Sequence, residues 1–295
     1  MTPPPIRRVA LIGRVAPFPA LGTLVQAAEW LEAHGCTPIV ETRSAAAAGV
    51  TARWGTAARE ALAGCADLVV AFGGDGTLLD AAGAVVHSPD DVPLMGVNLG
   101  RVGFLTEVAQ TDLANALEAV VAGRYRLETR LMLSGRVERA GTVFSARMAL
   151  NDIVVTRGAL SRMIDVNVDV DGRHVCHVKA DGLIVATATG STAYNISAGG
   201  PIVDPSVDAL LLTPIAPHTL TYRPLVLPAT AVIDLRPDVT PQSDIVATFD
   251  GQFGVPLQDQ DVVRIARAPR VLRLLHTSSR THFDMLREKL KWGNS

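Results

Sequence analysis

The spacing of hydrophobic residues changes once along this chain, near Tyr125, and this change constrains the fold more than any other feature. Before it, short and almost entirely apolar runs such as Val9–Ile12 and Asp67–Phe72 alternate with segments of helical spacing such as Leu21–His34. Strands that are apolar along their whole length are buried on both faces, which is typical of a parallel sheet covered by helices. We therefore expect residues 1–125 to form an α/β domain with a parallel sheet.

The same patterns predict further elements in this first domain. Strands are expected at Thr37–Val40 and Val92–Val97, and helices at Thr56–Leu62 and Leu78–Val86. Gly35 follows the first helix and is expected to close it, because glycine adopts the left-handed conformation freely.

After Tyr125 the pattern becomes that of half-buried strands. Val166–Val170 alternates strictly between apolar and polar residues, and the Asp171–Gly172 pair behind it is a strong signal for a hairpin. Further strands are expected at Met148–Val155, His174–Val178, Leu183–Thr187, Leu210–Thr213, Leu225–Leu227, Val232–Leu235 and Asp244–Phe249. We therefore expect residues 126–280 to form a mainly antiparallel β domain. A helix within residues 281–293 is expected to pack back on the first domain.

Bulk properties exclude several classes of protein. The formal net charge is −2, with acidic and basic residues interspersed, so there is no cationic field that would hold a nucleic-acid backbone. The three cysteines, Cys36, Cys65 and Cys176, are odd in number and far apart, which favours a reduced, cytoplasmic compartment. No stretch approaches the ~18 apolar residues of a membrane span, so no membrane partner is expected.

The sharpest local signal is the run Gly73-Gly74-Asp75-Gly76-Thr77, between an expected buried strand and an expected helix. Glycines let the backbone approach phosphate without Cβ clashes, and the N–H groups of a helix start form an anion site. A carboxylate used only for binding would repel phosphate, so Asp75 is better explained as facing the hydroxyl that is phosphorylated. The alternative is a glycine-rich turn in which Asp75 caps the helix.

This pentapeptide resembles a superfamily that includes NAD kinases and the lipid kinases that act on diacylglycerol or sphingosine, and phosphofructokinases carry a close variant. The run alone leaves these open. The segment Asp181–Pro201, DGLIVATATGSTAYNISAGGP, resembles the long NAD kinase signature nearly letter for letter. It departs at Ala188, where that family usually has proline. Without the resemblance, the segment could be a Ser/Thr-rich turn with Tyr194 in the core.

Other stretches are also similar to NAD kinases. Gly96–Thr106 resembles the family's second α/β loop, with Leu99 where arginine is frequent, and Asn151-Asp152 resembles an Asn-acid pair that contacts the dinucleotide. Phe249–Gln252 resembles a late hairpin whose glutamine lines the site. The resemblance therefore covers nearly the whole chain.

The resemblance implies an ATP-dependent NAD kinase, which phosphorylates the 2′-hydroxyl of the adenosine ribose of NAD to form NADP. It implies that Asp75 is the general base and that Tyr194 stacks on a ring of the ligand. Phosphate and ATP would be bound by Gly73, Gly74, Gly76 and Thr77. The implied NAD-binding residues are Asp75, Gly76, Asn151, Asp152, Arg162, Lys179, Asp181, Thr192, Ala193, Tyr194, Asn195, Ile196, Ser197, Ala216 and Gln252.

The spacing of His, Cys, Asp and Glu indicates no metal site in the chain, so a divalent ion, Mg²⁺, is expected to arrive with ATP. The resemblance implies a homodimer or homotetramer, with NAD and ATP as partners. Two other functions are weighed: a lipid kinase, which has no use for the Asp181–Pro201 segment, and a dinucleotide sensor without activity, which has no use for Asp75.

Overall fold

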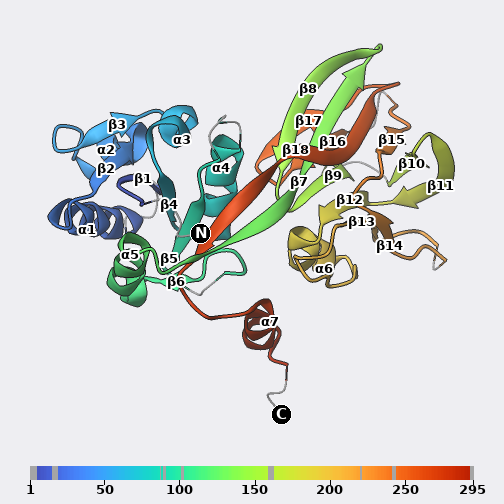
Figure 1. The fold of residues 1–295 in the computed structure, drawn as a ribbon. Coiled ribbons are helices and arrows are strands. Elements are labelled where there is room, and N and C mark those ends of the chain that lie inside the picture. Colours follow the sequence, from blue (N-terminus) through green and yellow to red (C-terminus); the bar gives the residue numbers. More distant parts are fainter. Residues whose placement is uncertain are drawn as a thin grey trace. The chain divides into compact units, whose positions relative to one another are not determined.

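The computed structural model describes residues 5–14, 19–86, 88, 91–100, 103–158, 163–219, 221–240 and 244–292. The chain divides into two compact units (Figure 1). Unit 1 comprises residues 1–129 and 272–295, and unit 2 comprises residues 130–271. The unit boundaries fall inside two long strands, β7 (Arg126–Arg139) and β18 (Val262–His276).

Unit 1 alternates strands with helices, as its apolar runs predict. Its elements are β1 (Arg8–Gly13), α1 (Pro19–Ala33), β2 (Thr37–Glu41), α2 (Thr42–Ala48), β3 (Gly55–Ala57), α3 (Leu62–Cys65), β4 (Leu68–Phe72), α4 (Asp75–Val85), β5 (Leu94–Asn98), β6 (Val108–Ala109), α5 (Leu113–Val121) and α7 (His282–Leu290). Two short 3₁₀ turns lie at Arg59–Ala61 and Gln110–Asp112.

The sheet of unit 1 is parallel and has the order β3-β2-β1-β4-β5, with Leu274 of β18 beside Leu94 of β5. In this order the chain builds outward from β1 to β3 and then returns to the other side of β1 with β4. Open parallel sheets bind ligands beyond the carboxyl ends of the strands at such a reversal. The residues that follow β4 are the glycine-rich run at Gly73, so the topology places this run where a ligand is expected.

One helix predicted for unit 1 is only partly right, because Arg59–Ala61 is a 3₁₀ turn and α3 begins at Leu62, but the start of the segment is a strand. Residues Gly55–Ala57, at the start of the expected helix Thr56–Leu62, form the edge strand β3 and pair in parallel with Ile39–Glu41 of β2. Pairing with an otherwise open strand edge outweighs the modest helical preference of this segment.

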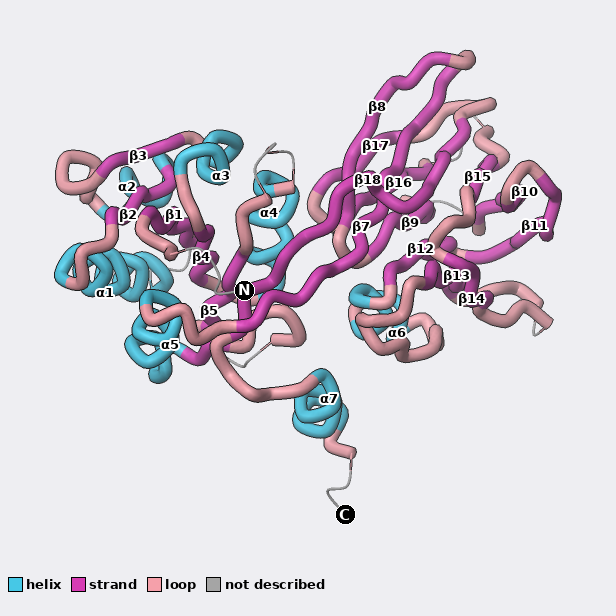
Figure 2. Tube along the Cα trace, viewed as in Figure 1, coloured by secondary structure: helices cyan, strands magenta, loops and turns pink. Residues whose placement is uncertain are grey.

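Unit 2 is built almost entirely of strands (Figure 2). They are the β7–β8 hairpin with β8 at Thr142–Ala149, then β9 (Asp152–Arg157), β10 (Ile164–Val170), β11 (Arg173–Ala180), β12 (Gly182–Thr187), β13 (Ala209–Ile215), β14 (Leu225–Pro228), β15 (Ile233–Pro237), β16 (Ile245–Phe249) and β17 (Phe253–Pro256). A 3₁₀ turn at Thr189–Thr192 and the single-turn helix α6 (Tyr194–Ser197) follow β12.

Two antiparallel arrangements make up unit 2. One runs β14-β13-β12-β9-β16-β17, and the other runs β11-β10-β15-β18 with β7 and β8 beyond it. The expected hairpin at Asp171-Gly172 joins β10 to β11, and Asp171 and Gly172 both have positive φ. The expected continuous strand Met148–Val155 is instead two strands, because the chain turns at Leu150-Asn151 between β8 and β9.

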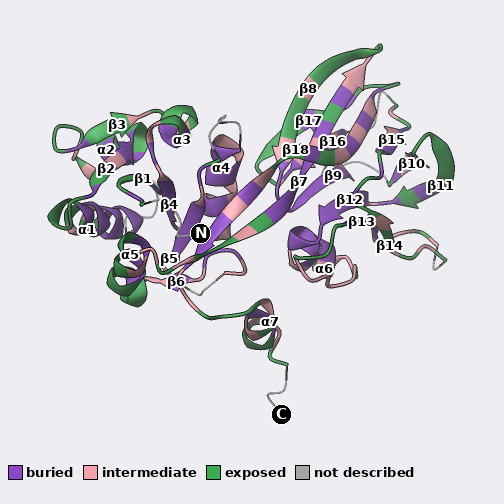
Figure 3. Cartoon of the chain, viewed as in Figure 1, coloured by how far each residue is buried: buried purple, intermediate pink, exposed green. Residues whose placement is uncertain are grey.

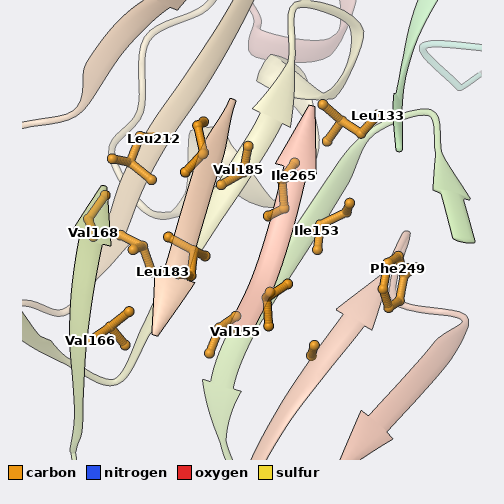
Figure 4. Close-up of a cluster of buried hydrophobic side chains, with 14 of the residues drawn as sticks. Leu133, Ile153, Val155, Val166, Val168, Leu183, Val185, Leu212, Phe249 and Ile265 are labelled. Carbon is orange, nitrogen blue, oxygen red and sulfur yellow. The ribbon is translucent and has the colours of Figure 1, made fainter. Parts of the chain in front are cut away.

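Each unit has its own apolar core, visible as the buried strands in Figure 3. In unit 2, side chains from β9, β10, β12, β16 and β18 converge, among them Val155, Val168, Val185 and Ile265 (Figure 4). In unit 1, Leu11, Val70 and Met95 of the central strands are fully buried. The fold class is confirmed: a parallel α/β unit and a mainly antiparallel β unit.

Candidate active site

The glycine-rich run of unit 1 connects a fully buried strand to a helix. The five residues of β4 are all buried, and α4 begins at Asp75, with Gly74 as its N-cap. Any Cβ on Gly73 would collide with the side chain of Thr77, which requires glycine there. Gly74 and Gly76 are exposed, so the start of α4 presents backbone rather than side chains to a ligand. Such helix starts bind anions.

The Asp75 carboxylate binds a second loop rather than its own helix. Its Oδ2 accepts a hydrogen bond from Phe104 N at 2.8 Å, and its Oδ1 accepts from Leu105 N at 3.2 Å, Thr106 N at 3.0 Å and Thr106 Oγ1 at 2.8 Å. A Cβ on Gly103 would overlap this carboxylate. Helix capping therefore does not explain Asp75, which is held by the segment that follows β5.

That segment is itself fixed by β5. Asn98 is the last residue of the strand. Its Nδ2 donates a hydrogen bond to Thr106 Oγ1 at 2.8 Å, and its Oδ1 accepts one from Gly100 N at 2.7 Å. Gly73 N donates to Val97 O at 2.9 Å, so the carboxyl ends of β4 and β5 meet here. The two loops that the sequence indicates, 73–77 and the described residues of 96–106, form one hydrogen-bonded group around Asp75.

In unit 2, Asn151 and Asp152 lie where β8 turns into β9, and an unexpected residue holds them. Asp250, in the turn between β16 and β17, accepts hydrogen bonds from three consecutive backbone N–H groups: Leu150 at 2.8 Å, Asn151 at 2.7 Å and Asp152 at 3.1 Å. Its own N–H donates to Asp152 O at 2.9 Å. The Asp-Gly pair indicates a turn from sequence, but nothing in its spacing shows that the carboxylate faces another loop.

Asp152 has the most perturbed carboxyl of the predicted site. Only 5% of the residue is exposed, and its carboxyl makes no hydrogen bond or ion pair within the described residues. Burial, and to a smaller extent the neighbouring Asp250 carboxylate, together raise the pKa of Asp152 to about 7. Burial also raises the pKa of Asp250, against the effect of its three backbone donors. Asp152 therefore titrates well above the usual range of an aspartate, toward neutral pH.

The long signature segment forms β12 and a tight loop that binds the Asn151 turn. Thr187 N donates to Asn151 O at 2.9 Å, and Thr187 Oγ1 donates to Leu150 O at 2.6 Å. A Cβ on Gly190 would collide with Asn151 O, so only glycine allows this approach. The backbone of the signature loop therefore packs directly beside Asn151.

Asn195 has a structural role within this loop. The residue is completely buried, its Nδ2 donates to Ser191 O at 3.1 Å and Pro201 O at 3.0 Å, and its Oδ1 accepts from Thr213 Oγ1 at 2.7 Å. Both amide hydrogens and the carbonyl oxygen are engaged within the protein, and the side chain is completely buried, so it is not presented to a ligand. Gly200 is needed because a Cβ there would overlap the same amide.

The neighbours of Asn195 do face outward. Tyr194 is 47% exposed, Ser197 is exposed, and Thr192, Ala193 and Ile196 are partly exposed. The open ring of Tyr194 excludes the alternative in which it fills the core. This loop therefore offers an aromatic face, a hydroxyl and backbone groups to a ligand.

Asp181 directly precedes β12, at the end of that strand away from the signature loop, and Lys179 lies two residues earlier on β11. Asp181 accepts two hydrogen bonds from the Arg157 guanidinium, from Nε at 2.9 Å and from Nη2 at 3.3 Å. Lys179 Nζ lies 3.3 Å from Asp165 Oδ2. Because Ala186 pairs with Asp152 and Gly182 with Thr156, Asp152 and Asp181 are separated by roughly five residues of strand, or ~16 Å. Only an extended ligand could contact both.

Arg157 and Asp165 were not among the sequence candidates. Arg157 ends β9, and Asp165 lies on β10 among alternating polar residues. Their signal is present only in the pairing register, which brings Asp165 opposite Lys179.

Three predicted residues remain. Ala216 follows β13, is exposed and has φ +44°, and exposed Gln252 lies on the β16–β17 turn beside Asp250. Arg162 lies outside the described residues.

A cavity of about 530 Å³ in unit 1, lined by residues such as Glu107, Asp112 and Arg280, includes none of the predicted site residues.

No group of three or more His, Cys, Asp or Glu side chains in the described ranges is arranged to hold a metal ion. None of the helices within those ranges has the length and apolar character needed to span a membrane.

Comparison with known proteins identifies the family. Residues 19–125 match the ATP-NAD kinase N-terminal domain, and residues 150–277 match the ATP-NAD kinase C-terminal domain. The chain belongs to the ATP-NAD kinase family. It is similar to the NAD kinases of Citrifermentans bemidjiense, at 43% identity over 98% of this chain and 99% of that one, and of Azoarcus sp. strain BH72, at 42% over 97% and 96%.

Solved structures of family members have the same fold. Yeast NADH kinase complexed with NADH has a TM-score of 0.86 and 25% identity, covering 99% of this chain and 89% of that one. An NAD kinase from Archaeoglobus fulgidus in complex with ATP has a TM-score of 0.72 and 27% identity, covering 96% and 98%. The predicted family is therefore confirmed.

Proposed function

We propose that this chain transfers the γ-phosphoryl group of ATP to the 2′-hydroxyl of the adenosine ribose of NAD, and that Asp75 is the general base. Membership of the ATP-NAD kinase family supports the overall reaction. The observation that carries the role of Asp75 is its fixed carboxylate at the end of β4, beside an exposed glycine backbone at the start of α4.

The hydrogen bonds of Asp75 leave room for a proton. A carboxylate oxygen has two lone-pair positions. Oδ1 accepts three hydrogen bonds and Oδ2 accepts only the one from Phe104 N within the described residues. Oδ2 is therefore the atom that takes the proton from the 2′-hydroxyl, while the other contacts hold the carboxylate still.

The reaction balances without a further reactant. The 2′-oxygen forms a bond to the γ-phosphorus as the bond from that phosphorus to the β–γ bridging oxygen breaks, and ADP leaves. The hydroxyl proton passes to Asp75 Oδ2. Positioning and neutralisation of charge supply most of the acceleration in phosphoryl transfer. Mg²⁺ enters as part of the substrate Mg-ATP, bound chiefly by the phosphate oxygens.

The residues of unit 2 bind NAD in this proposal. Asn151 and Asp152 bind the adenosine, Tyr194 stacks on a ring, and Ser197, Thr192 and Ala193 supply polar groups. Asp181, about 16 Å along the strands from Asp152, binds another part of the dinucleotide together with Lys179. Residues Gly73, Gly74, Gly76 and Thr77 give room to phosphate. We also propose a cytoplasmic homodimer or homotetramer that prefers NAD over NADH.

The test is direct. Purified protein is incubated with NAD, ATP and Mg²⁺, and NADP is measured with an NADP-specific dehydrogenase. Parallel reactions contain NADH, diacylglycerol or no acceptor. NADP formation that depends on ATP supports the proposal. Phosphorylation of diacylglycerol instead, or NAD binding without NADP formation, would establish one of the two other functions.

A further inference from the structure

Two buried carboxyl groups share the turn that begins β9, and they have opposite surroundings. Asp250 is surrounded by donors, because three successive backbone N–H groups converge on it. Asp152, whose own N–H is one of those donors, has no donor for its carboxyl within the described residues, although only 5% of it is exposed. A buried carboxylate without a donor or a cation is unfavourable, so such a group takes up a proton or waits for a ligand.

The elements around Asp152 supply no compensating charge. Strands β12 and β16 flank β9 on its two sides, and neither contains a charged residue. The signature loop 188–193, which follows β12, contains none either. From the β7–β8 hairpin, Gly135 packs on Ile153, and the Arg147 guanidinium stacks 4.4 Å above the Phe253 ring. The charged group that faces Asp152 is therefore Asp250.

We propose that Asp152 binds NAD as a neutral carboxylic acid that donates its proton to an acceptor atom of the adenosine, and that Asp250 is the positioning residue that keeps it neutral. This inference rests on the proposed function, because it takes Asn151 and Asp152 as the adenosine site. Asp250 acts in two ways: its three backbone contacts fix the turn, and its negative charge disfavours ionisation of its neighbour. The pKa of Asp152, raised to about 7, agrees with this geometry.

The sign of the pH dependence follows. The binding form is protonated, so NAD affinity is constant at acidic pH and falls as pH rises through the titration of Asp152. If only the neutral form binds, the fall approaches tenfold per pH unit. Binding above neutral pH then takes up nearly one proton from solvent for each NAD bound.

The experiment measures NAD binding to the full-length protein by calorimetry from pH 5.5 to 9. We expect Kd to rise about tenfold or more between pH 6.5 and 8.5. At pH 8, the enthalpy should depend on the ionisation enthalpy of the buffer, compared between phosphate and Tris, as required by uptake of close to one proton. These two measurements need no variant. Affinity that is flat with pH, or that tightens above pH 7, overturns the proposal.

Two variants separate a protonation role from a purely structural one. Asp152→Asn carries a permanently neutral donor, so its NAD affinity should be flat with pH and within a few-fold of the parent value at pH 6. Asp250→Asn removes the neighbouring charge, so the loss of affinity should begin at a lower pH than in the parent. A steep pH dependence retained in folded Asp152→Asn would assign the titration to another group and overturn the proposal.

Failure of the inference is distinguishable from failure of the proposed function. NADP formation by the parent protein is measured at pH 6.5 in the same preparation. If NADP forms but affinity does not vary with pH, only the role of Asp152 is wrong. If no NADP forms, the proposed function fails whatever the binding curve shows.

Discussion

Asp75 and Asp152 are both aspartates at the first position of a regular element beside a turn, and their surroundings could hardly differ more. Four hydrogen bonds from one loop fix the Asp75 carboxylate. The Asp152 carboxyl receives none within the described residues and lies next to another acid. The comparison shows that one residue type is held by four donors in one unit and receives none in the other, and our proposals assign a proton-accepting role to the first and a neutral donor role to the second.

The largest effect should come from Asp75→Asn. The amide oxygen can keep the contacts to Leu105 and Thr106, but Nδ2 then faces Phe104 N, so two donors meet and one bond is lost. Loss of the proton acceptor should lower kcat by ~10² to 10⁴, while the lost hydrogen bond costs about 1–3 kcal/mol of stability. The measurements are kcat, calorimetric Kd for NAD and NADP, and denaturant unfolding.

Asp75→Ala is the matched control, because it removes all four hydrogen bonds together with the base. If Asp75 is both base and anchor, Ala should lose similar activity but more stability than Asn. Folded Asp75→Asn protein with kcat within threefold of the parent would leave Asp75 as a loop anchor only. A collapse of NAD binding that accounts for the loss of activity would make it chiefly a binding residue.

Asp152→Asn should stabilise the protein without ligand, but only away from acidic pH. The folded-state pKa of Asp152 is raised, from ~3.9 in the unfolded chain to about 7. A raised acid pKa favours folding at low pH, and that contribution is lost as pH rises between these values. At pH 8, the variant should exceed the parent by roughly 2–4 kcal/mol in free energy of unfolding, and at pH 4 the two should be nearly equal. Equal differences at both pH values would contradict this.

The fold could be predicted well because the burial of a segment and the spacing of its apolar residues can both be inferred from the local sequence. The continuous apolar run that becomes β4 and the alternation of Val166–Val170 correspond to buried parallel and half-buried antiparallel strands. The failure at Thr56–Leu62 has the opposite cause, because that segment is weakly patterned and its first residues pair with the open edge of β2.

The candidate site was predictable only where a motif marked it. Gly73–Thr77 and Asp181–Pro201 carry unusual glycine and hydroxyl content. The structure exposes Gly74, Gly76, Tyr194 and Ser197, and it leaves no room for a Cβ at Gly73, Gly190 or Gly200. Asp250 and Arg157 were missed because their importance depends on contacts 24 to 100 residues away in sequence. Asn195, by contrast, was chosen for its position in the motif, and the burial of its amide shows that it supports the loop.

A smaller effect is expected from Arg157→Lys. Lysine keeps the charge but cannot form the two-fold contact with Asp181, whose side chain is 36% exposed. NAD affinity should weaken about threefold to tenfold while kcat stays within twofold, because Arg157 positions a binding residue rather than a reacting one. Arg157→Ala should weaken affinity further. If Arg157→Ala and Asp181→Asn weaken affinity additively when combined, the two residues act independently and the positioning role is wrong.

The smallest effect concerns the choice between NAD and NADH, and its sign follows from an ion pair. Lys179 Nζ lies 3.3 Å from Asp165 Oδ2, so the pair is close to neutral toward the positively charged nicotinamide ring of NAD. Asp165→Asn leaves Lys179 uncompensated and should lower the ratio of kcat/KM for NAD to that for NADH, whereas Lys179→Ala leaves Asp165 and should raise it. Both side chains are partly exposed, so each change should be about twofold to fivefold and should shrink at high salt. If both variants change the ratio in the same direction, the ion pair affects the choice of nucleotide through the shape of the site rather than its charge. If neither variant changes the ratio, the nicotinamide does not bind near Lys179.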